Sequence, residues 1–247
     1  MANSPFSHKY LLTILFLLIS LKGATAQDEL NNQLEQDSIE WVTIRVIDWE
    51  MIPKPSLALG NAFIFDVNTA QLPDDFDMMK LEVSCRQIIN AKVLGAERLQ
   101  DVSSLCEFGM DEAVTGIHHE EATAFCHQIK GELPSESQWV YVASKIGSAW
   151  LTEHGMFDRI LHEATLTMES FKEDVTDAQE GPYGIQGLYG NVWEMTRSKW
   201  ANQTAQFVIK GGAFDLSNKP WLMHPYLRAA FIATDIHNQN IGFRCVR

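Results

Sequence analysis

The chain is short of positive charge and of cysteine. It has 19 Lys and Arg against 32 Asp and Glu, and its formal net charge over 247 residues is −13. This balance excludes proteins that bind nucleic acid or anionic lipid through a basic surface. After the N-terminal segment, no apolar run approaches the roughly 20 residues of a membrane-spanning helix. The CxxC, HxH and HxxxH patterns of redox and metal sites are absent as well.

The N-terminal segment has the pattern of a secretory signal peptide. Lys9 precedes the apolar run YLLTILFLLISL, and the small residues ATA end at position 26. We expect residues 1–26 to be cleaved before Gln27, and an uncleaved N-terminal anchor is the alternative. Residues 27–39 are polar and acidic and predict a solvated leader. The sequence thus predicts one domain over residues 40–247 of a secreted or periplasmic protein, with no integral membrane span after signal cleavage.

The domain has four cysteines, which are Cys85, Cys106, Cys126 and Cys245. In an oxidising compartment an even number of cysteines favours disulfides over metal ligands or a nucleophile. Four cysteines permit three pairings, and their spacing does not choose among them.

Strand patterns occur at both ends of the domain and helical patterns in its middle. Ser135 and Gln138 have the spacing of a capping box. Residues 163–190 are acidic and aperiodic and predict a long irregular segment. Because strands and helices do not alternate, the order indicates an α+β fold. The predicted strands are 40–53, 61–68, 206–214, 227–233 and 241–247, and the predicted helices are 78–95, 118–131 and 135–147.

Several short motifs follow one another along the domain. They are MIPKPSLALG at 51–60, MKLEVSC at 79–85, EEATAFCHQIKGELPSESQW at 120–139, YGIQGLYGNVWEM at 183–195, VIKGGAF at 208–214 and IGFRCVR at 241–247. Their order closely resembles the formylglycine-generating enzyme family, also called the sulfatase-modifying factor domain. The resemblance covers about residues 40–247. It implies a formylglycine-generating-enzyme-like variant of the C-type lectin fold, α+β with much irregular structure.

The resemblance also implies a disulfide pairing. In the family the cysteine of the AYC motif is linked to that of the GFRC motif, which here means Cys126 and Cys245. Cys85 and Cys106 match no family position and would then pair with each other.

A calcium site is implied at the GNVWE turn. The family builds this site from backbone carbonyls and a carboxylate, which match the carbonyls of Gly190 and Val192 and the carboxylate of Glu194. Oxygen ligands from a tight turn suit a hard cation. The family has a further side-chain ligand where this chain has Gly187, so one ligand is missing. The alternative is a structural turn in which Trp193 packs in the core and Glu194 accepts backbone N–H groups.

The copper site of the enzyme is not matched. The family's oxidase holds copper with two cysteines after its GGS motif, and Leu216 and Trp221 occupy those positions here. No cysteine lies between Gly212 and Cys245. Since thiolates select Cu(I), copper is not supported and formylglycine generation by the known mechanism is not expected.

The domain's histidines show no chelating pattern, so the sequence does not support iron either. A cluster of three with Glu121 is the alternative to ordinary surface or hydrogen-bonded histidines. The histidines are His118, His119, His127, His154, His162, His224 and His237.

The family's structural motifs are present in this chain, but its copper-binding cysteines are not. This combination favours a noncatalytic accessory or binding module for a protein or glycan partner. Trp221, Tyr226 and Arg228 lie in the aromatic-rich segment KPWLMHPYLRAAF and predict a binding groove, with core packing as the alternative. We assign no catalytic residue. The alternative function is a metal-dependent oxidoreductase of the same superfamily, acting on a small metabolite or a protein side chain, because members without the cysteine pair include such oxidases.

Overall fold

The computed structural model describes most of the expected domain. The chain divides into Met1–Ile39 and Glu40–Arg247, and all the described helices and strands belong to the second unit. In this part of the chain no helix has both the length and the apolar character needed to cross a membrane. The predicted signal peptide lies outside the described residues, as does nearly all of the leader. The described residues are 38–47, 64–65, 73–106, 109–144, 175–177, 180–201, 205–216, 225–235 and 239–247.

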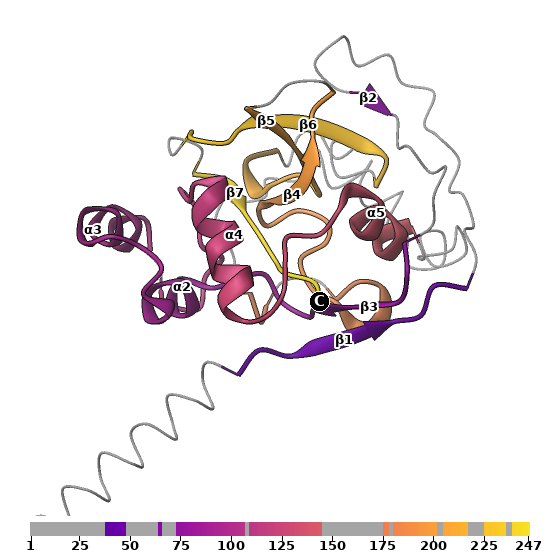
Figure 1. Cartoon of the computed structure of the whole chain (residues 1–247), viewed down its shortest axis with the longest axis horizontal. Coiled ribbons are helices and arrows are strands. Elements are labelled where there is room, and N and C mark those ends of the chain that lie inside the picture. Colours follow the sequence, from indigo (N-terminus) through magenta and orange to yellow (C-terminus); the bar gives the residue numbers. More distant parts are fainter. Residues whose placement is uncertain are drawn as a thin grey trace, which may run out of the picture. The chain divides into compact units, whose positions relative to one another are not determined.

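The strands form two sheets. In the smaller one, β1 (Trp41–Ile44) pairs antiparallel with β3 (Phe76–Met79), with Trp41 opposite Met79. The larger sheet has the order β2-β6-β5-β4-β7, in which β4 and β7 are parallel and the other pairs antiparallel (Figure 1). Its strands are β2 (Ile64–Phe65), β4 (Trp193–Lys199), β5 (Gln206–Lys210), β6 (Leu227–Ile232) and β7 (Ile241–Gly242).

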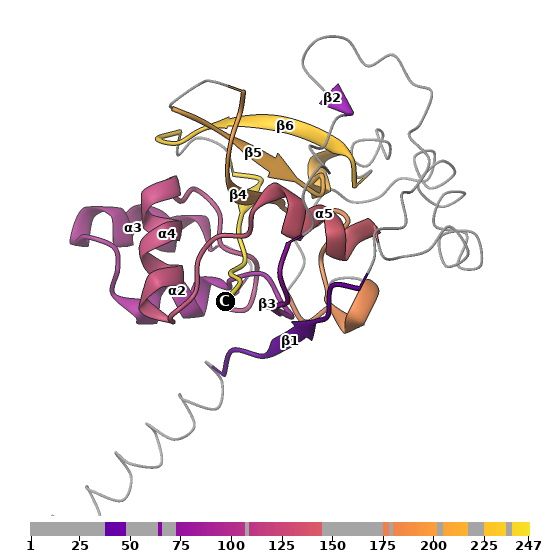
Figure 2. The same cartoon turned by 45° about the vertical axis from the view of Figure 1, so that its right-hand side comes forward.

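Helix α5 (Glu136–Ser144) lies between the two sheets, as Figures 1 and 2 both show. Its sequence WVYVA is apolar on every side, which is the pattern of a fully buried helix. Its residues share a hydrophobic cluster with Ile44 of β1 and with Phe76 and Met78 of β3. The helix begins with a capping box, in which the Gln138 N–H donates to Ser135 Oγ and the Ser135 N–H donates to Gln138 Oε1. The predicted cap is therefore confirmed.

The other helices gather on one side of the sheets (Figures 1 and 2). They are α2 (Cys85–Ala91), α3 (Ala96–Leu105) and α4 (His119–Gln128). Arg98 of α3 donates to both carboxylate oxygens of Glu121 in α4, each at 3.0 Å, and to the Gly116 carbonyl at 2.7 Å. The Cys85–Cys106 disulfide joins the start of α2 to the residue that follows α3. The three helices are thus connected by an ion pair and a covalent bond.

The C-terminal segment runs along β3 and fastens it to α4. Met79 and Asp77 donate their backbone N–H groups to the carbonyls of Cys245 and Arg247. The second disulfide, Cys126–Cys245, anchors the same segment to α4. A Cβ on Gly131 would lie 2.5 Å from the Val246 carbonyl oxygen, so only glycine permits this close approach. Cys126–Cys245 is the pair that the resemblance implied, and Cys85–Cys106 is the pair that was then left.

The structure confirms the mixed α+β class but corrects several element boundaries. The predicted helix at 78–95 was wrong at its start, because Met78 and Met79 belong to β3 and α2 begins only after the Ser84 cap. Helix α3 was not predicted, although Ala, Glu, Arg, Leu and Gln are good helix formers. Strand β4 was also missed, since its sequence continues directly from the glycine-rich turn. The predicted strand at 206–214 ends at Lys210, before two glycines with positive φ.

Candidate functional site

The GNVWE turn is a left-handed backbone segment held between strands. Gly187, Gly190 and Asn191 have φ angles of 73°, 96° and 49°. The Gly190 N–H donates to the Gly211 carbonyl at 2.9 Å, and the Asn191 carbonyl accepts from the Phe214 N–H at 2.9 Å. The two glycines therefore provide the positive φ angles that the turn requires. The turn leads directly into β4, whose first two residues are Trp193 and Glu194.

Glu194 is fully buried and lies at the centre of a charged hydrogen-bond network. Its Oε2 accepts from Trp139 Nε1 at 2.8 Å and from Arg244 Nε at 2.8 Å. Its Oε1 accepts from Arg244 Nη2 at 2.7 Å. Bidentate, charge-assisted hydrogen bonds between an arginine and a carboxylate are among the strong hydrogen bonds in proteins. Three motifs that are far apart in sequence thus meet at one carboxylate.

Arg244 is also fully buried, and its guanidinium donates further hydrogen bonds to backbone carbonyls. Nη1 donates to the Met79 and Lys80 carbonyls at 3.2 and 3.1 Å, and Nη2 donates to the Gln186 carbonyl at 2.6 Å. The side chain therefore ties the end of β3 and the approach to the turn to β4.

A second buried carboxyl, Glu82, lies against the turn. Its Oε2 accepts from Asn191 Nδ2 at 2.5 Å, and the Val192 N–H also donates to this carboxyl. Its Oε1 has no hydrogen-bond partner among the residues that the structure describes. Burial, and after it the charge of Glu194, raises the pKa of Glu82 to about 8, against the opposing effect of Arg244.

The Glu82 carboxyl fills the space beside Gly187. A Cβ built on Gly187 would lie 2.7 Å from Glu82 Oε2 and 2.8 Å from its carboxyl carbon, so no larger residue fits without displacing Glu82. Glu82 was not among the site residues predicted from the sequence. Its only signal there was the KLEVSC motif, which was quoted as part of the family resemblance.

A separate group of charged residues with buried or mostly buried side chains comes from β5, β6 and the start of α5. Lys210 Nζ donates to the Leu227 carbonyl at 2.6 Å and lies 3.5 Å from Glu136 Oε1. Arg228 Nε lies 2.7 Å from the same oxygen, and the guanidinium is 5.2 Å from the centre of the Trp200 ring. Burial lowers the pKa of Lys210 to about 8; the charge of Glu136 opposes this shift and that of Arg228 adds to it.

The three residues of the predicted groove have different surroundings. Tyr226 is 1% exposed and packs in the hydrophobic cluster of α5. The Arg228 side chain is 19% exposed and takes part in the ion pair with Glu136. Trp221 lies outside the described residues. The groove therefore stays a prediction, with Arg228 as its partly exposed described member.

The described histidines contact different groups; His118 is the N-cap of α4 and His119 is its first residue. His119 hydrogen-bonds through Nε2 to the Thr196 carbonyl at 3.0 Å and stacks on the Phe207 ring at 3.4 Å. Burial lowers the pKa of His119. His118 lies 3.8 Å from Glu121 Oε1, and His127 is exposed. The remaining four histidines of the domain, His154, His162, His224 and His237, lie outside the described residues.

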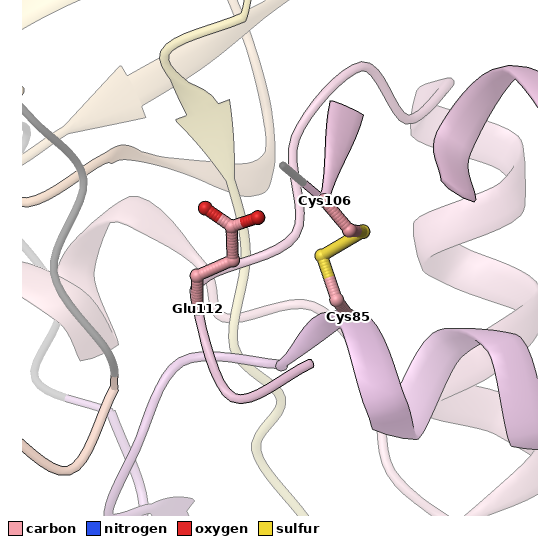
Figure 3. Close-up of side chains that lie close together, drawn as sticks. All are labelled: Cys85, Cys106 and Glu112. Carbon is pink, nitrogen blue, oxygen red and sulfur yellow. A yellow bond between two sulfur atoms is a disulfide. The ribbon is translucent and has the colours of Figure 1, made fainter. Parts of the chain in front are cut away.

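Within the described residues, one group of three has the His, Cys, Asp or Glu composition of a metal site. It consists of Cys85, Cys106 and Glu112, whose ligand atoms lie within 4.8 Å of one another (Figure 3). The two sulfurs are bonded to each other, so in this form the group has no thiolate to offer. Nothing in the sequence indicated that Glu112 would lie beside this disulfide.

Comparison with known proteins identifies the family. A family model described as "Sulfatase-modifying factor enzyme 1-like domain" matches residues 50–247. The chain is 29% identical over 175 residues to the uncharacterized protein YfmG of Bacillus subtilis, a match that covers 54% of this chain and 35% of YfmG. The chain thus spans about a third of the length of this curated relative.

Solved structures show the same fold at low sequence identity. The crystal structure of CarF has a TM-score of 0.56 at 16% identity and covers 85% of this chain and 98% of its own. PvdO from Pseudomonas aeruginosa has a TM-score of 0.52 at 14% identity and covers 71% and 81% of the two chains. Treponema denticola variable protein 1 has a TM-score of 0.51 at 14% identity, with coverages of 70% and 84%. The chain therefore belongs to the family of sulfatase-modifying factor enzyme 1-like domains, the formylglycine-generating enzyme family.

Proposed function

We propose that this protein is a secreted or periplasmic accessory protein whose domain binds a protein or glycan partner and catalyses no reaction. The observation that carries the proposal is the state of its cysteines. All four are in disulfides, and the positions of the family's copper cysteines hold Leu216 and Trp221. A Cu(I) site of the family's kind needs thiolates, and this chain has none to give.

The use of the family motifs inside the domain supports the same proposal. Trp139, Glu194 and Arg244 come from three motifs and bind one another in the buried interior. These residues therefore account for the fold, and their presence does not require catalysis.

The disulfides also support an oxidising compartment, because such bonds persist in secreted and periplasmic proteins. The Cys126–Cys245 bond closes a long loop, at a sequence separation of 119 residues.

The proposed binding surface centres on Trp221 of the aromatic-rich segment 219–231, with the partly exposed Arg228 and the neighbouring Trp200 at its described edge. Tyr226, Leu227 and Phe231 of the same segment are buried and take no part in it. The test is a glycan array together with cross-linking to secreted proteins, using the wild type and a Trp221→Ala variant. The matched control is Trp41→Ala, which removes an indole from the smaller sheet. We expect a ligand that the wild type and Trp41→Ala retain and that Trp221→Ala binds more than about tenfold more weakly, as a binding hot spot would.

Oxygen consumption in the presence of Cu(I) and a cysteine-containing peptide tests the opposite case. The proposal predicts no turnover above the rate of the copper ion alone. Sustained turnover, or stoichiometric iron or copper in the purified protein, would replace the binding module with the metal-dependent oxidoreductase of the same superfamily.

We further propose that the GNVWE turn binds calcium through the carbonyls of Gly190 and Val192 and the carboxylate of Glu194. The donor set supports this, since all three ligands are oxygen atoms on a tight turn. The orphaned Glu82 Oε1 beside the turn gives further support, because a buried carboxyl oxygen without a donor fits a neighbouring cation. Glu194 accepts three hydrogen bonds, and a carboxylate has about four acceptor positions, so one position on Oε1 remains.

A further inference from the structure

We infer that Glu82 supplies the cation ligand that Gly187 lacks, so that the calcium site is completed from the segment after β3 and not from the turn itself. This inference rests on the calcium proposal above and names one further residue for it.

The first observation is the space beside Gly187. At this position the turn has no side-chain oxygen, and a Cβ there would lie 2.7 Å from Glu82 Oε2. The Glu82 carboxyl therefore occupies the volume into which a side chain at position 187 would extend. A carboxyl at that place can offer an oxygen in the same region that an Asp or Asn at 187 would reach.

The second observation is how the carboxyl is held. Asn191 Nδ2 and the Val192 N–H both donate to Glu82, and Oε2 is the oxygen that Asn191 holds. Oε1 has no hydrogen-bond partner within the described parts of the chain, although Glu82 is 1% exposed. A buried carboxyl oxygen without a donor is costly, and a cation is one way to satisfy it.

The third observation is the charge around the turn. Two buried carboxyls, Glu82 and Glu194, face one guanidinium, Arg244. Buried carboxyl oxygens are normally satisfied by hydrogen-bond donors or by a metal ion. A donor set made only of oxygen atoms suits calcium and not the soft transition metals.

The test is a calcium titration of the full mature chain after removal of divalent ions with a chelator. Thermal unfolding reports stabilisation, and terbium luminescence sensitised by the nearby tryptophans reports binding directly. We expect added calcium to raise the wild-type melting temperature, because an ion that binds only the native state stabilises it by mass action.

Three variants test Glu82 itself. Glu82→Gln keeps the size of the side chain and an oxygen that can accept from Asn191, but it removes the negative charge. We expect the calcium affinity of this variant to fall more than about tenfold. Glu112→Gln is the matched control, since Glu112 is an equally buried glutamate whose carboxyl lies beside the Cys85–Cys106 disulfide, and its affinity should match the wild type. The double variant Glu82→Ala, Gly187→Asp returns a carboxylate from position 187, where Asp tolerates the positive φ, and it should regain calcium binding.

The outcomes separate this inference from the proposal on which it rests. If the wild type shows neither stabilisation nor terbium binding, the calcium proposal fails and the inference with it. If the wild type binds calcium and Glu82→Gln binds it equally well, calcium stands and the role of Glu82 is overturned. Should Glu82→Gln unfold, the double variant still decides, because failure to regain binding in a folded Glu82→Ala, Gly187→Asp protein contradicts the inference.

Discussion

The indole N–H of Trp139 donates to Glu194 Oε2 at 2.8 Å, which joins the buried helix α5 to the start of β4 across 55 residues of sequence. Both residues are fully buried, so the bond lies where no water replaces a lost donor. The tryptophan and the glutamate belong to two family motifs, and the contact explains why a large aromatic residue with a polar atom is needed in α5.

The Trp139 contact predicts a specific loss of stability. Trp139→Phe removes the donor and part of the packing, and we expect the free energy of unfolding to fall by about 1–3 kcal/mol. Urea unfolding followed by circular dichroism measures it. Trp193→Phe is the comparison, because it shortens another buried indole and leaves the Trp139–Glu194 bond intact. Equal losses in the two variants would show that packing alone matters.

Arg244 should be far more important than the other C-terminal arginine. Arg244→Met leaves Glu194 buried without its cation, and breaking a buried pair costs about 3–5 kcal/mol. Arg247→Met breaks a half-exposed ion pair with Asp77 and a cation–π contact with the Trp41 ring, and should cost at most about 2 kcal/mol. The same unfolding measurement compares them, and similar losses at the two positions would contradict the central place of Arg244.

The two disulfides should differ in their contribution to stability. The Cys126–Cys245 bond spans 119 residues and the Cys85–Cys106 bond spans 21. Loop-closure entropy then gives the longer bond about 5 kcal/mol and the shorter about 3 kcal/mol. Paired Cys→Ala variants of each bond, unfolded in urea, measure the difference. A larger loss on removal of Cys85–Cys106 would show that contacts around α2 and α3 outweigh chain entropy.

Lys210 gives the protein a pH-dependent stability at alkaline pH. Burial lowers the folded-state pKa of Lys210 to about 8 from the ordinary 10.5, so between these values the unfolded chain binds more protons than the native one. The contribution of Lys210 to stability therefore rises as the pH increases from about 8 to 10.5. Glu136 and Arg228 are the charged groups that face it.

The measurement compares the wild type with Lys210→Met at pH 7, 8.5 and 10. The difference in unfolding free energy, wild type minus variant, should increase with pH, because other titrating groups cancel. A difference that stays constant over this range would mean that Lys210 keeps its proton in the native state.

The sequence predicted the motif-bearing parts of the molecule better than the contacts between them. Ser135 and Gln138 predicted the start of α5 correctly because a capping box is a local pattern. Met78 and Met79 form a strand because they pair with β1, which lies more than thirty residues earlier. The helical spacing of the residues around them led to the wrong prediction of a helix. Periodicity within one segment cannot report a partner strand.

The candidate site shows the same limit. Glu194 was singled out because it belongs to the GNVWE motif. The hydrogen-bond donors to its carboxylate, however, come from α5 and from the C-terminal segment. Glu82 was missed because a lone glutamate in a segment with helical spacing has no local signal of burial. Its importance follows only from the space beside Gly187, which exists once the chain has folded.

The metal content of the mature protein tests the central claim most directly. The protein is purified from its native compartment without chelators or a histidine tag and analysed by elemental mass spectrometry. If the protein is a noncatalytic, calcium-binding domain with two disulfides, we expect about one equivalent of calcium, with copper and iron far below stoichiometry. About one equivalent of copper or iron would contradict this account and make the protein a metal-dependent oxidoreductase.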